Sequence, residues 1–475
     1  MKRAARNGVM AAVFLSVGWV GGSQGQVANA VGQFVSVPEP VVALTNVRLI
    51  DGTGTPARSG MTVVIAEGRI RTVGPTSSIR PPQGARVIDL DGHTVMPGMI
   101  GLHDHMYYSS VGGSMKPMLQ SYPRLFIAAG VTTIRTTGSV DPYQELNLRA
   151  AIEAGQMVGP EIFVTGPYLQ GAMQGYSVMH PLEGPEDARR MVRYWAEEGV
   201  SWFKAYTTIT RAELAAAIDE AHKHGVKVTA HLCSVGFREA VAAGIDNLEH
   251  GLLVNTEYQS GKQPDQCPTG SSRGENYANL DITSADVQRT IREMVQNNVS
   301  MTSTLAVMEL STPDRVPHDE RVLDAVFADA RKALVDWRSA ERPVDRTAHA
   351  ALKKAMEFER AFVAAGGTLA AGSDPCCLTA IAGYADQRNF ELLVEAGFTP
   401  EQATQIMSAN GAKVLGIADR VGTLRPGLQA DLVVLHGDLT ADPATIRNVT
   451  YVFRKGIGYD PVKLTDSVKG MVGIR

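Results

Sequence analysis

Two histidines separated by one residue, His103 and His105, follow directly on an apolar run over 95–102. Side chains of a strand alternate between its two faces, so both imidazoles can point the same way and bind one metal ion. Other residues of types found at metal sites stand at or just after later apolar runs: Lys204, His231, His250 and Asp374. Six such residues at the ends of apolar runs predict a metal centre that several strands build together.

The elements that would position these residues form a repeating pattern. Short apolar runs alternate with stretches such as 185–192 and 211–218, where apolar residues recur every three or four positions, as in amphipathic helices. We count eight runs: 95–102, 131–136, 161–166, 202–206, 227–232, 245–249, 299–305 and 368–373. This α/β alternation is typical of a TIM-like (β/α)8 barrel, whose active face lies at the carboxyl ends of the parallel strands. All six candidate ligands would then meet at one barrel mouth.

Outside the predicted barrel, which spans 95–418, both ends of the chain contain short β runs bounded by turn residues. Asn46–Ile50 and Met61–Ile65 each lead into a turn, and Ala430–Leu435 follows a similar turn near the other end. We therefore predict that residues 31–94 and 419–475 are two halves of one small β-sandwich domain.

The first 30 residues have the pattern of a secretory signal peptide. Lys2, Arg3 and Arg6 precede the apolar stretch Val9–Val20, which is too short to span a membrane as a helix. Cleavage is expected after Ala30 or a few residues earlier, and the mature protein would be periplasmic or secreted. Loss of three positive charges changes the formal net charge from −4 to −7. A mildly acidic surface disfavours nucleic acid or a membrane as a partner.

Four cysteines are present: Cys233, Cys267, Cys376 and Cys377. Their connectivity cannot be read from the sequence, although an oxidising export compartment would permit disulfides. One interpretation is that Cys267 bridges to Cys376 or Cys377, beside Asp374, and so holds a loop over the site. The equally acceptable alternative is four unpaired thiols.

On these motifs, the chain resembles the metal-dependent amidohydrolase superfamily, and most of all its branch of secreted dipeptidases and imidazolonepropionase-related enzymes. The resemblance covers nearly the whole mature chain. It rests on an ordered set of segments: 51–52, 97–105, 130–133, 204–206, 231, 249–251, 372–374 and 427–435. A single His-x-His motif is weak support, whereas the ordered set is specific.

The resemblance implies two divalent metal ions and a role for each histidine. His103 and His105 would bind the more buried ion, and His231 and His250 the more exposed one. Zinc is the expected metal because the site is rich in imidazole.

For the other two ligands the resemblance implies more than metal binding. Lys204 would bridge the ions after its amine has reacted with carbon dioxide, since the resulting carbamate has two anionic oxygens. Asp374 would bind the first ion and act as the catalytic acid and base. The alternatives are a Lys204 that pairs with a carboxylate in a site of one metal, and an Asp374 that caps the following helix.

The implied function is an exported amidohydrolase that cleaves an amide bond in dipeptides or N-acyl amino acids by attack of a metal-bridging hydroxide. The substrate would be a small molecule. The same centre could instead open a lactone, a cyclic amide or a phosphotriester, and a non-catalytic scaffold is the alternative from another class. The oligomeric state stays open, a homo-oligomer included.

Three further side chains could take part in the site. Tyr206 lies two residues after Lys204 and could contact the substrate carbonyl or carboxylate, or else pack as a barrel aromatic. His180 follows the loop 171–179 and could line the pocket. For Arg135, an internal ion pair is favoured over a substrate carboxylate.

Two long stretches interrupt the alternation of runs. Residues 254–281 are polar and rich in loop-forming residues, and they follow His250 directly, so we predict a lid or specificity loop. Residues 313–351 are charged and are expected to form helices that pack around the barrel.

Overall fold

Among the described residues, nine parallel strands coincide with the eight predicted apolar runs, in the same order along the chain. The computed structural model describes residues 30–109, 115–172, 178–268 and 273–473, and residues 1–29 of the predicted signal peptide lie outside these ranges. The strands are β7 (Met99–Asp104), β10 (Val131–Thr136), β11 (Glu161–Phe163), β12 (Thr165–Leu169), β13 (Trp202–Ala205), β14 (Lys227–Ala230), β15 (Asn247–Glu249), β16 (Ser300–Ser303) and β17 (Leu369–Ala371). They form two sheets in which all neighbours are parallel, in the orders β11-β10-β7 and β12-β13-β14-β15-β16-β17.

The predicted run 161–166 is divided between these two sheets. It breaks at Val164, so that β11 pairs with β10 and β12 pairs with β13. An isolated bridge from Ser139 to Pro167 links the end of the β10 segment to β12.

The segment after the last strand returns to the first strand. The backbone N–H groups of Ser373 and Asp374 both donate to the carbonyl oxygen of His103, at 3.1 and 2.8 Å. A Cβ atom on Gly372 would stand only 2.2 Å from the backbone nitrogen of His103, so only glycine permits this approach. The ends of β7 and β17 are therefore neighbours, as the predicted barrel requires.

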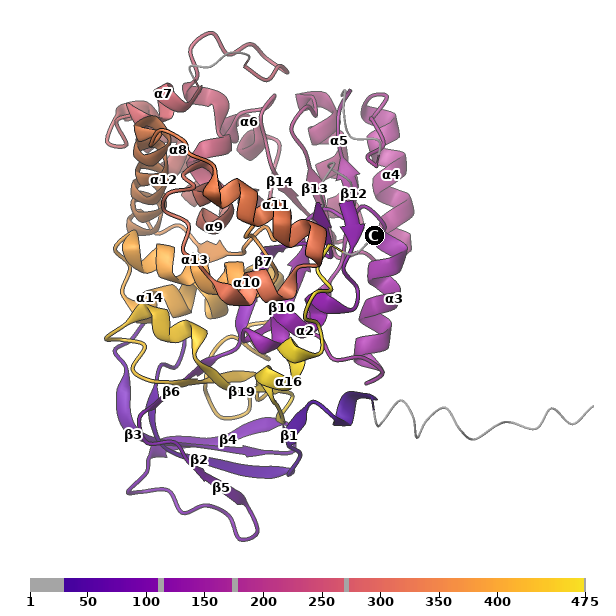
Figure 1. Cartoon of the computed structure of the whole chain (residues 1–475). Coiled ribbons are helices and arrows are strands. Elements are labelled where there is room, and N and C mark those ends of the chain that lie inside the picture. Colours follow the sequence, from indigo (N-terminus) through magenta and orange to yellow (C-terminus); the bar gives the residue numbers. More distant parts are fainter. Residues whose placement is uncertain (1–29, 110–114, 173–177, 269–272, 474–475) are drawn as a thin grey trace, which may run out of the picture.

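Helices surround the parallel strands, as Figure 1 shows for α3, α4, α12 and α13. The two stretches predicted as helices, 185–192 and 211–218, are the first parts of α4 and α5, which both extend further along the chain. The helices of the barrel region with eight or more residues are α2 (Ser121–Ala128), α3 (Pro142–Glu153), α4 (Pro185–Glu197), α5 (Arg211–Lys223), α8 (Ala285–Gln296), α11 (Ala328–Ser339), α12 (Arg346–Ala364) and α13 (Tyr384–Glu395). The shorter ones are α6 (Phe237–Ala242), α7 (Arg273–Ala278), α9 (Leu305–Met308), α10 (Glu320–Ala325), α14 (Pro400–Gln405) and α15 (Gly411–Leu415).

Helix α5 illustrates how local sequence sets these bounds. The Thr210 side chain accepts a hydrogen bond from the backbone N–H of Glu213, while the Glu213 carboxylate accepts from the N–H of Thr210. This reciprocal capping satisfies donors that the first turn leaves free. His222 and Lys223 lie in the last turn, where positive charge complements the helix dipole.

The stretch 313–351 is helical, as predicted, and contributes α10, α11 and the start of α12. Among the described residues, no helix combines the length and apolar character that crossing a membrane would need.

Both chain ends join one antiparallel-rich sheet beside the parallel strands (Figure 1). Its order is β1-β20-β19-β18-β6-β2-β3-β4, with β5 against β2. The strands are β1 (Val35–Val37), β2 (Val41–Leu49), β3 (Arg58–Ala66), β4 (Arg69–Pro75), β5 (Arg86–Asp89), β6 (His93–Pro97), β18 (Leu432–His436), β19 (Val449–Arg454) and β20 (Ile457–Tyr459). Helix α16 (Pro461–Asp466) follows them. The two ends thus meet in one sheet, whereas the sandwich form of the prediction is not confirmed by the pairing of the described strands.

The predicted run 95–102 belongs to both parts of the structure. Strand β6 ends at Pro97 in the side sheet, and β7 begins at Met99 among the parallel strands. The N–H of Gly98 donates to the side-sheet residue Asp431 at 3.0 Å, and the N–H of Met99 donates to Gly130 at 2.9 Å. The chain therefore passes from one sheet to the other at Gly98.

A disulfide joins Cys233 and Cys267, with their Cα atoms 5.1 Å apart. Both predicted alternatives for the cysteines, a bridge from Cys267 to Cys376 or Cys377 and four unpaired thiols, were therefore wrong. The segment after β15 folds back onto the chain that follows β14, where the Thr256 hydroxyl donates to the carbonyl of Cys233 at 2.6 Å. This return brings Cys267 to Cys233 and ties down part of the predicted lid over 254–281.

The shared core of the side sheet can be tested at Leu432, which is fully buried between residues of both chain ends. We expect Leu432→Ala to lower the free energy of unfolding by about 2–5 kcal/mol, because a cavity remains. Val87→Ala, at a side chain 53% exposed in the same sheet, should change it by less than about 0.5 kcal/mol. Urea denaturation measures both, and equal losses would contradict a core shared by the two ends.

The buried carboxyl of Glu359, on α12, should make the stability of the protein depend on pH. Burial raises the pKa of this carboxyl from its ordinary 4.5 to about 8, against the opposing effect of a hydrogen bond with Ser303. The folded state therefore keeps a proton that the unfolded chain loses, and stability falls as the pH rises from about 4.5 to about 8. We expect Glu359→Gln, which stays neutral, to flatten this fall in urea unfolding measured across that range. Identical slopes for the two proteins would contradict the assignment.

Candidate metal centre

The six predicted ligands lie at the carboxyl ends of the parallel strands. His103 is the second-to-last residue of β7 and Lys204 is the third residue of β13, while His250 directly follows β15. The other three also follow strands: His105 after β7, His231 after β14 and Asp374 after β17. Because the strands are parallel, all of their carboxyl ends lie at the same end of the sheets.

His103 is fully buried and lies between two polar groups. Its Nδ1 lies 2.8 Å from a carboxylate oxygen of Glu249, and its Nε2 lies 2.9 Å from Nζ of Lys204. The Glu249 carboxylate accepts a hydrogen bond from the Nδ1–H group, which keeps the proton on Nδ1 and leaves the lone pair of Nε2 directed toward the centre.

His250 reaches the centre from the other side with a left-handed backbone, φ 63°. Its Nδ1 lies 2.7 Å from the hydroxyl of Thr304, whereas its buried Nε2 has no hydrogen-bond partner among the described residues. That nitrogen is 4.0 Å from Asp374 Oδ2. Ligand atoms of His103, His250 and Asp374 all lie within 4.8 Å of one another. An unpartnered buried nitrogen facing a carboxylate and a second imidazole fits a divalent cation.

The remaining histidines join the same cluster. His105 Nε2 lies 3.0 Å from Asp374 Oδ1, and the His231 ring centroid is 4.3 Å from that of His250. The structure therefore brings all six residues predicted from the sequence together.

Burial determines the protonation of this cluster. It lowers the pKa values of His103 and His250, and the nearby Lys204 ammonium lowers them further, so both imidazoles are neutral. Burial alone would raise the pKa of Asp374, but the polar rings of His103 and His105 beside it and the charge of Lys204 outweigh this effect and hold that pKa well below its usual range. Neutral imidazoles beside an ionised carboxylate are the donor forms that a divalent cation requires.

Lys204 is the unusual member of the set, with a side chain that is 1% exposed. Burial lowers its pKa to about 8, although the charges of Glu249 and Asp374 oppose the shift. A substantial fraction of the amine is therefore neutral near pH 8.

A buried ion pair supports His103 from behind. Arg135 and Glu249 are both fully buried, and the Arg135 guanidinium donates to the Glu249 carboxylate, to Asn247 at 3.2 Å and to the carbonyl of Leu102. The prediction of an internal ion pair for Arg135 is confirmed. The role of Glu249 was missed, although a carboxylate beside Leu248 in a run predicted to be a buried strand was a signal that it needs buried partners.

The two other predicted site residues differ in their surroundings. Tyr206 packs at the edge of the cluster, with its ring 5.0 Å from that of His231 and 5.8 Å from Lys204 Nζ. His180 is 46% exposed and pairs with Asp187, in the first turn of α4, at 2.8 Å. The structure therefore does not bring His180 into the cluster; residues 173–177 of the loop before it lie outside the described ranges.

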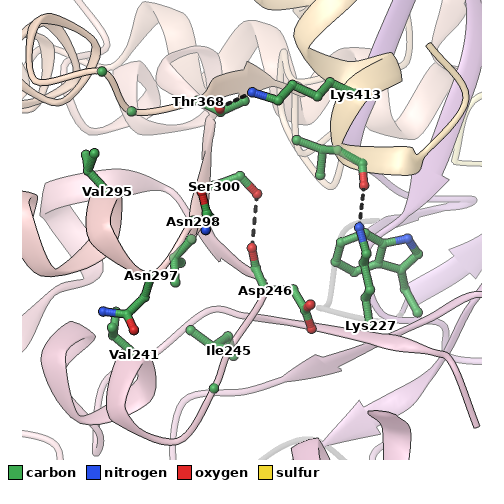
Figure 2. A pocket seen from close by; sticks show the side chains of 16 residues that line it. Lys227, Val241, Ile245, Asp246, Val295, Asn297, Asn298, Ser300, Thr368 and Lys413 are labelled. Carbon is green, nitrogen blue, oxygen red and sulfur yellow. Dashed lines mark hydrogen bonds between the residues drawn. The ribbon is translucent and has the colours of Figure 1, made fainter. Parts of the chain in front are cut away.

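A cavity of about 400 Å³ lies at the opposite ends of the same strands (Figure 2). Its lining includes Lys227 and Ser300, the first residues of β14 and β16, and Thr368, which precedes β17. Its two lysines already have partners, since Lys227 donates to the carbonyl of Val414 and Lys413 to the hydroxyl of Thr368. It is separate from the candidate metal centre, because the ligands occupy the other strand ends.

Comparison with known protein families identifies the family of this chain. A model of the amidohydrolase family matches residues 94–457 of the chain. The chain belongs to this family. Amidohydrolases generally use a binuclear metal centre, and in this chain His103, His250 and Asp374 form a cluster that could hold a metal ion.

Similar proteins agree with this assignment. The dihydroorotase of Anaeromyxobacter dehalogenans is 23% identical over 420 residues, which cover 82% of this chain and 87% of that protein. A solved structure of a candidate prolidase from Bifidobacterium longum has a TM-score of 0.66 and 25% identity, covering 90% of this chain and 98% of that one. A Xaa-Pro dipeptidase with methionine in its active site has a TM-score of 0.65 at 22% identity, covering 88% of this chain and 100% of that one. This amidohydrolase is a hydrolase of carbon–nitrogen bonds, with the fold of TIM-barrel relatives.

The buried ion pair predicts a large effect of removing one partner. We expect Arg135→Leu to lower the free energy of unfolding by roughly 3–5 kcal/mol, because Glu249 would keep a buried charge without its cation. Lys332→Ala is the control, since it breaks an ion pair with Asp336 in which both side chains are more than 60% exposed, and it should matter far less. Chemical denaturation compares them, and similar losses would refute the importance of the buried pair.

Proposed function

We propose that this amidohydrolase is exported and hydrolyses an amide bond in dipeptides or N-acyl amino acids at a centre of two divalent metal ions. The observation that carries the proposal is the position of Lys204. Its fully buried amine faces His103 at 2.9 Å, at the same strand ends as the histidines and Asp374. A lysine there favours a bridged pair of ions over a single ion.

A carbamate on Lys204 would make this lysine a ligand. An ammonium group cannot bind a cation, but a neutral amine can react with carbon dioxide to give two anionic oxygens. The pKa of about 8 supports this reaction near neutral pH. His103 and His105 would hold one ion, and His231 and His250 the other.

The metal ions, with zinc as the expected element, would supply a Lewis acid and lower the pKa of a bound water. Asp374 would then move the protons. Its carboxylate is ionised and 15% exposed, so it can reach a substrate that enters the mouth. It accepts a proton from the attacking water and delivers it to the leaving nitrogen. Tyr206, at the edge of the cluster, would contact the substrate carbonyl or carboxylate.

Similarity to the candidate prolidase favours dipeptides as the substrate class, including those with a C-terminal proline. The segment 254–281 would act as a specificity lid, because the Cys233–Cys267 disulfide anchors it two residues after His231. A cyclic amide is the second candidate, which the dihydroorotase relative favours.

Export is supported by two features of the chain. The first 30 residues have the signal-peptide pattern, and the Cys233–Cys267 disulfide is typical of an oxidising compartment. The mature protein would therefore be periplasmic or secreted.

The bridge is tested with Lys204→Ala. We expect the bound metal, measured by elemental analysis, to fall from two ions per chain to one or none, and hydrolysis of a panel of dipeptides and N-acyl amino acids to fall by at least roughly 100-fold. Added acetate should restore part of the activity, since its carboxylate replaces the two oxygens of the carbamate.

The matched control is Lys223→Ala, which removes a lysine that is 55% exposed on α5. It should keep both metal and activity. Unchanged metal content in Lys204→Ala would refute the bridge, and two bound ions without turnover on any amide would refute the substrate class.

A further inference from the structure

Two adjacent cysteines follow the metal-centre residue Asp374, and the proposed reaction uses neither. Cys376 and Cys377 are both partly exposed and unbonded, with their Sγ atoms 2.9 Å apart. We propose that this pair is a redox modification site, which closes reversibly to a disulfide by exchange with a small-molecule disulfide such as oxidised glutathione.

Hydrogen bonds hold the backbone around the two thiols on both sides. The carbonyl of Pro375 accepts from the Tyr122 hydroxyl at 3.1 Å, and the carbonyl of Cys376 accepts from the N–H of Ser109 at 2.6 Å. Beyond the pair, the carbonyl of Leu378 accepts from the Tyr108 hydroxyl at 2.9 Å. The loop therefore keeps the sulfur atoms together, which favours intramolecular over intermolecular reaction.

The exchange needs no reactant besides the two cysteines and one molecule of oxidised glutathione. One cysteine, as its thiolate, attacks a sulfur of oxidised glutathione, forms a mixed disulfide and releases one glutathione thiolate. The second cysteine then loses its proton and attacks the sulfur of the first. The bond between the cysteines forms as the second glutathione leaves, so two thiols are oxidised and one glutathione disulfide is reduced to two thiols.

A disulfide between two cysteines that are adjacent in the sequence is strained. Consecutive Cα atoms are about 3.8 Å apart, whereas disulfides usually join Cα atoms about 4.4–6.8 Å apart. Cys233 and Cys267, at 5.1 Å, are within that range. Strain makes a disulfide easier to reduce, so a Cys376–Cys377 bond would open under mild reductant that leaves the other bond intact.

Closing the pair would act on Asp374 through the backbone. The N–H of Cys376 donates to the carbonyl of Asp374 at 2.7 Å, and Asp374 itself has a left-handed backbone with φ 50°. A ring at 376–377 changes the backbone angles of Cys376 and so disturbs this contact. The oxidised protein should hold its metal more weakly; this consequence rests on the proposed function, whereas the thiol chemistry does not.

The test incubates the full mature protein with oxidised glutathione and follows it by intact mass and by peptide mapping after differential alkylation. We expect the loss of two hydrogen atoms at Cys376 and Cys377 without a retained glutathione, and reversal by mild reductant while Cys233–Cys267 persists. Cys376→Ser and Cys377→Ser, which each keep one thiol, should instead retain one glutathione. Free thiols at both positions after incubation, or a stable glutathione adduct on the parent protein, would overturn the proposal.

A second measurement separates this inference from the proposed function. Metal content and amide hydrolysis are compared before and after oxidation in the parent protein and in the double variant Cys376→Ala/Cys377→Ala, which cannot close. We expect at least a tenfold loss of hydrolysis, with loss of metal, in the oxidised parent alone. If the unoxidised parent binds no metal, the proposed function fails while the thiol result still stands. Equal losses in both proteins would overturn the link to Asp374.

Discussion

The buried contact between Glu249 and His103 is the interaction on which the candidate metal centre depends. His103 must present Nε2 to the centre, and the Glu249 carboxylate ensures this by accepting a hydrogen bond from Nδ1–H at 2.8 Å. A buried carboxylate is costly without a cation, and Arg135 supplies that cation from β10. The indole of Trp202 lies 4.5 Å from the guanidinium and covers it. Three strands that are distant in sequence therefore cooperate to orient a single imidazole.

Parallel strands explain why so many polar groups can be buried at one place. Each strand ends on the same side, so a ligand on one strand lies beside ligands on its neighbours. The return of the chain after β17 completes this arrangement, because Ser373 and Asp374 donate to the carbonyl of His103. The backbone of Asp374 is thus held against that of the first histidine.

The side sheet connects both chain ends to the strand that carries His103 and His105. Strand β6 pairs with β18 along its whole length, from Pro97 opposite Leu432 to His93 opposite His436. Two residues after Pro97, at Met99, the same chain enters β7. The sheet built from the two ends therefore fixes the starting point of the first parallel strand. The matched family region, residues 94–457, includes β18 and β19 of this sheet.

The sequence by itself determined the residue types of the centre, their order and the strands that bear them. This was possible because ligand chemistry and strand periodicity are local properties, as in His103 and His105 after an apolar run. Only the tertiary structure decided which distant groups meet. Glu249 was not assigned to His103, Cys267 pairs with Cys233 instead of Cys376 or Cys377, and His180 binds Asp187 at the surface. These pairings depend on how loops return to strand ends, which the alternation of apolar residues within a single segment does not encode.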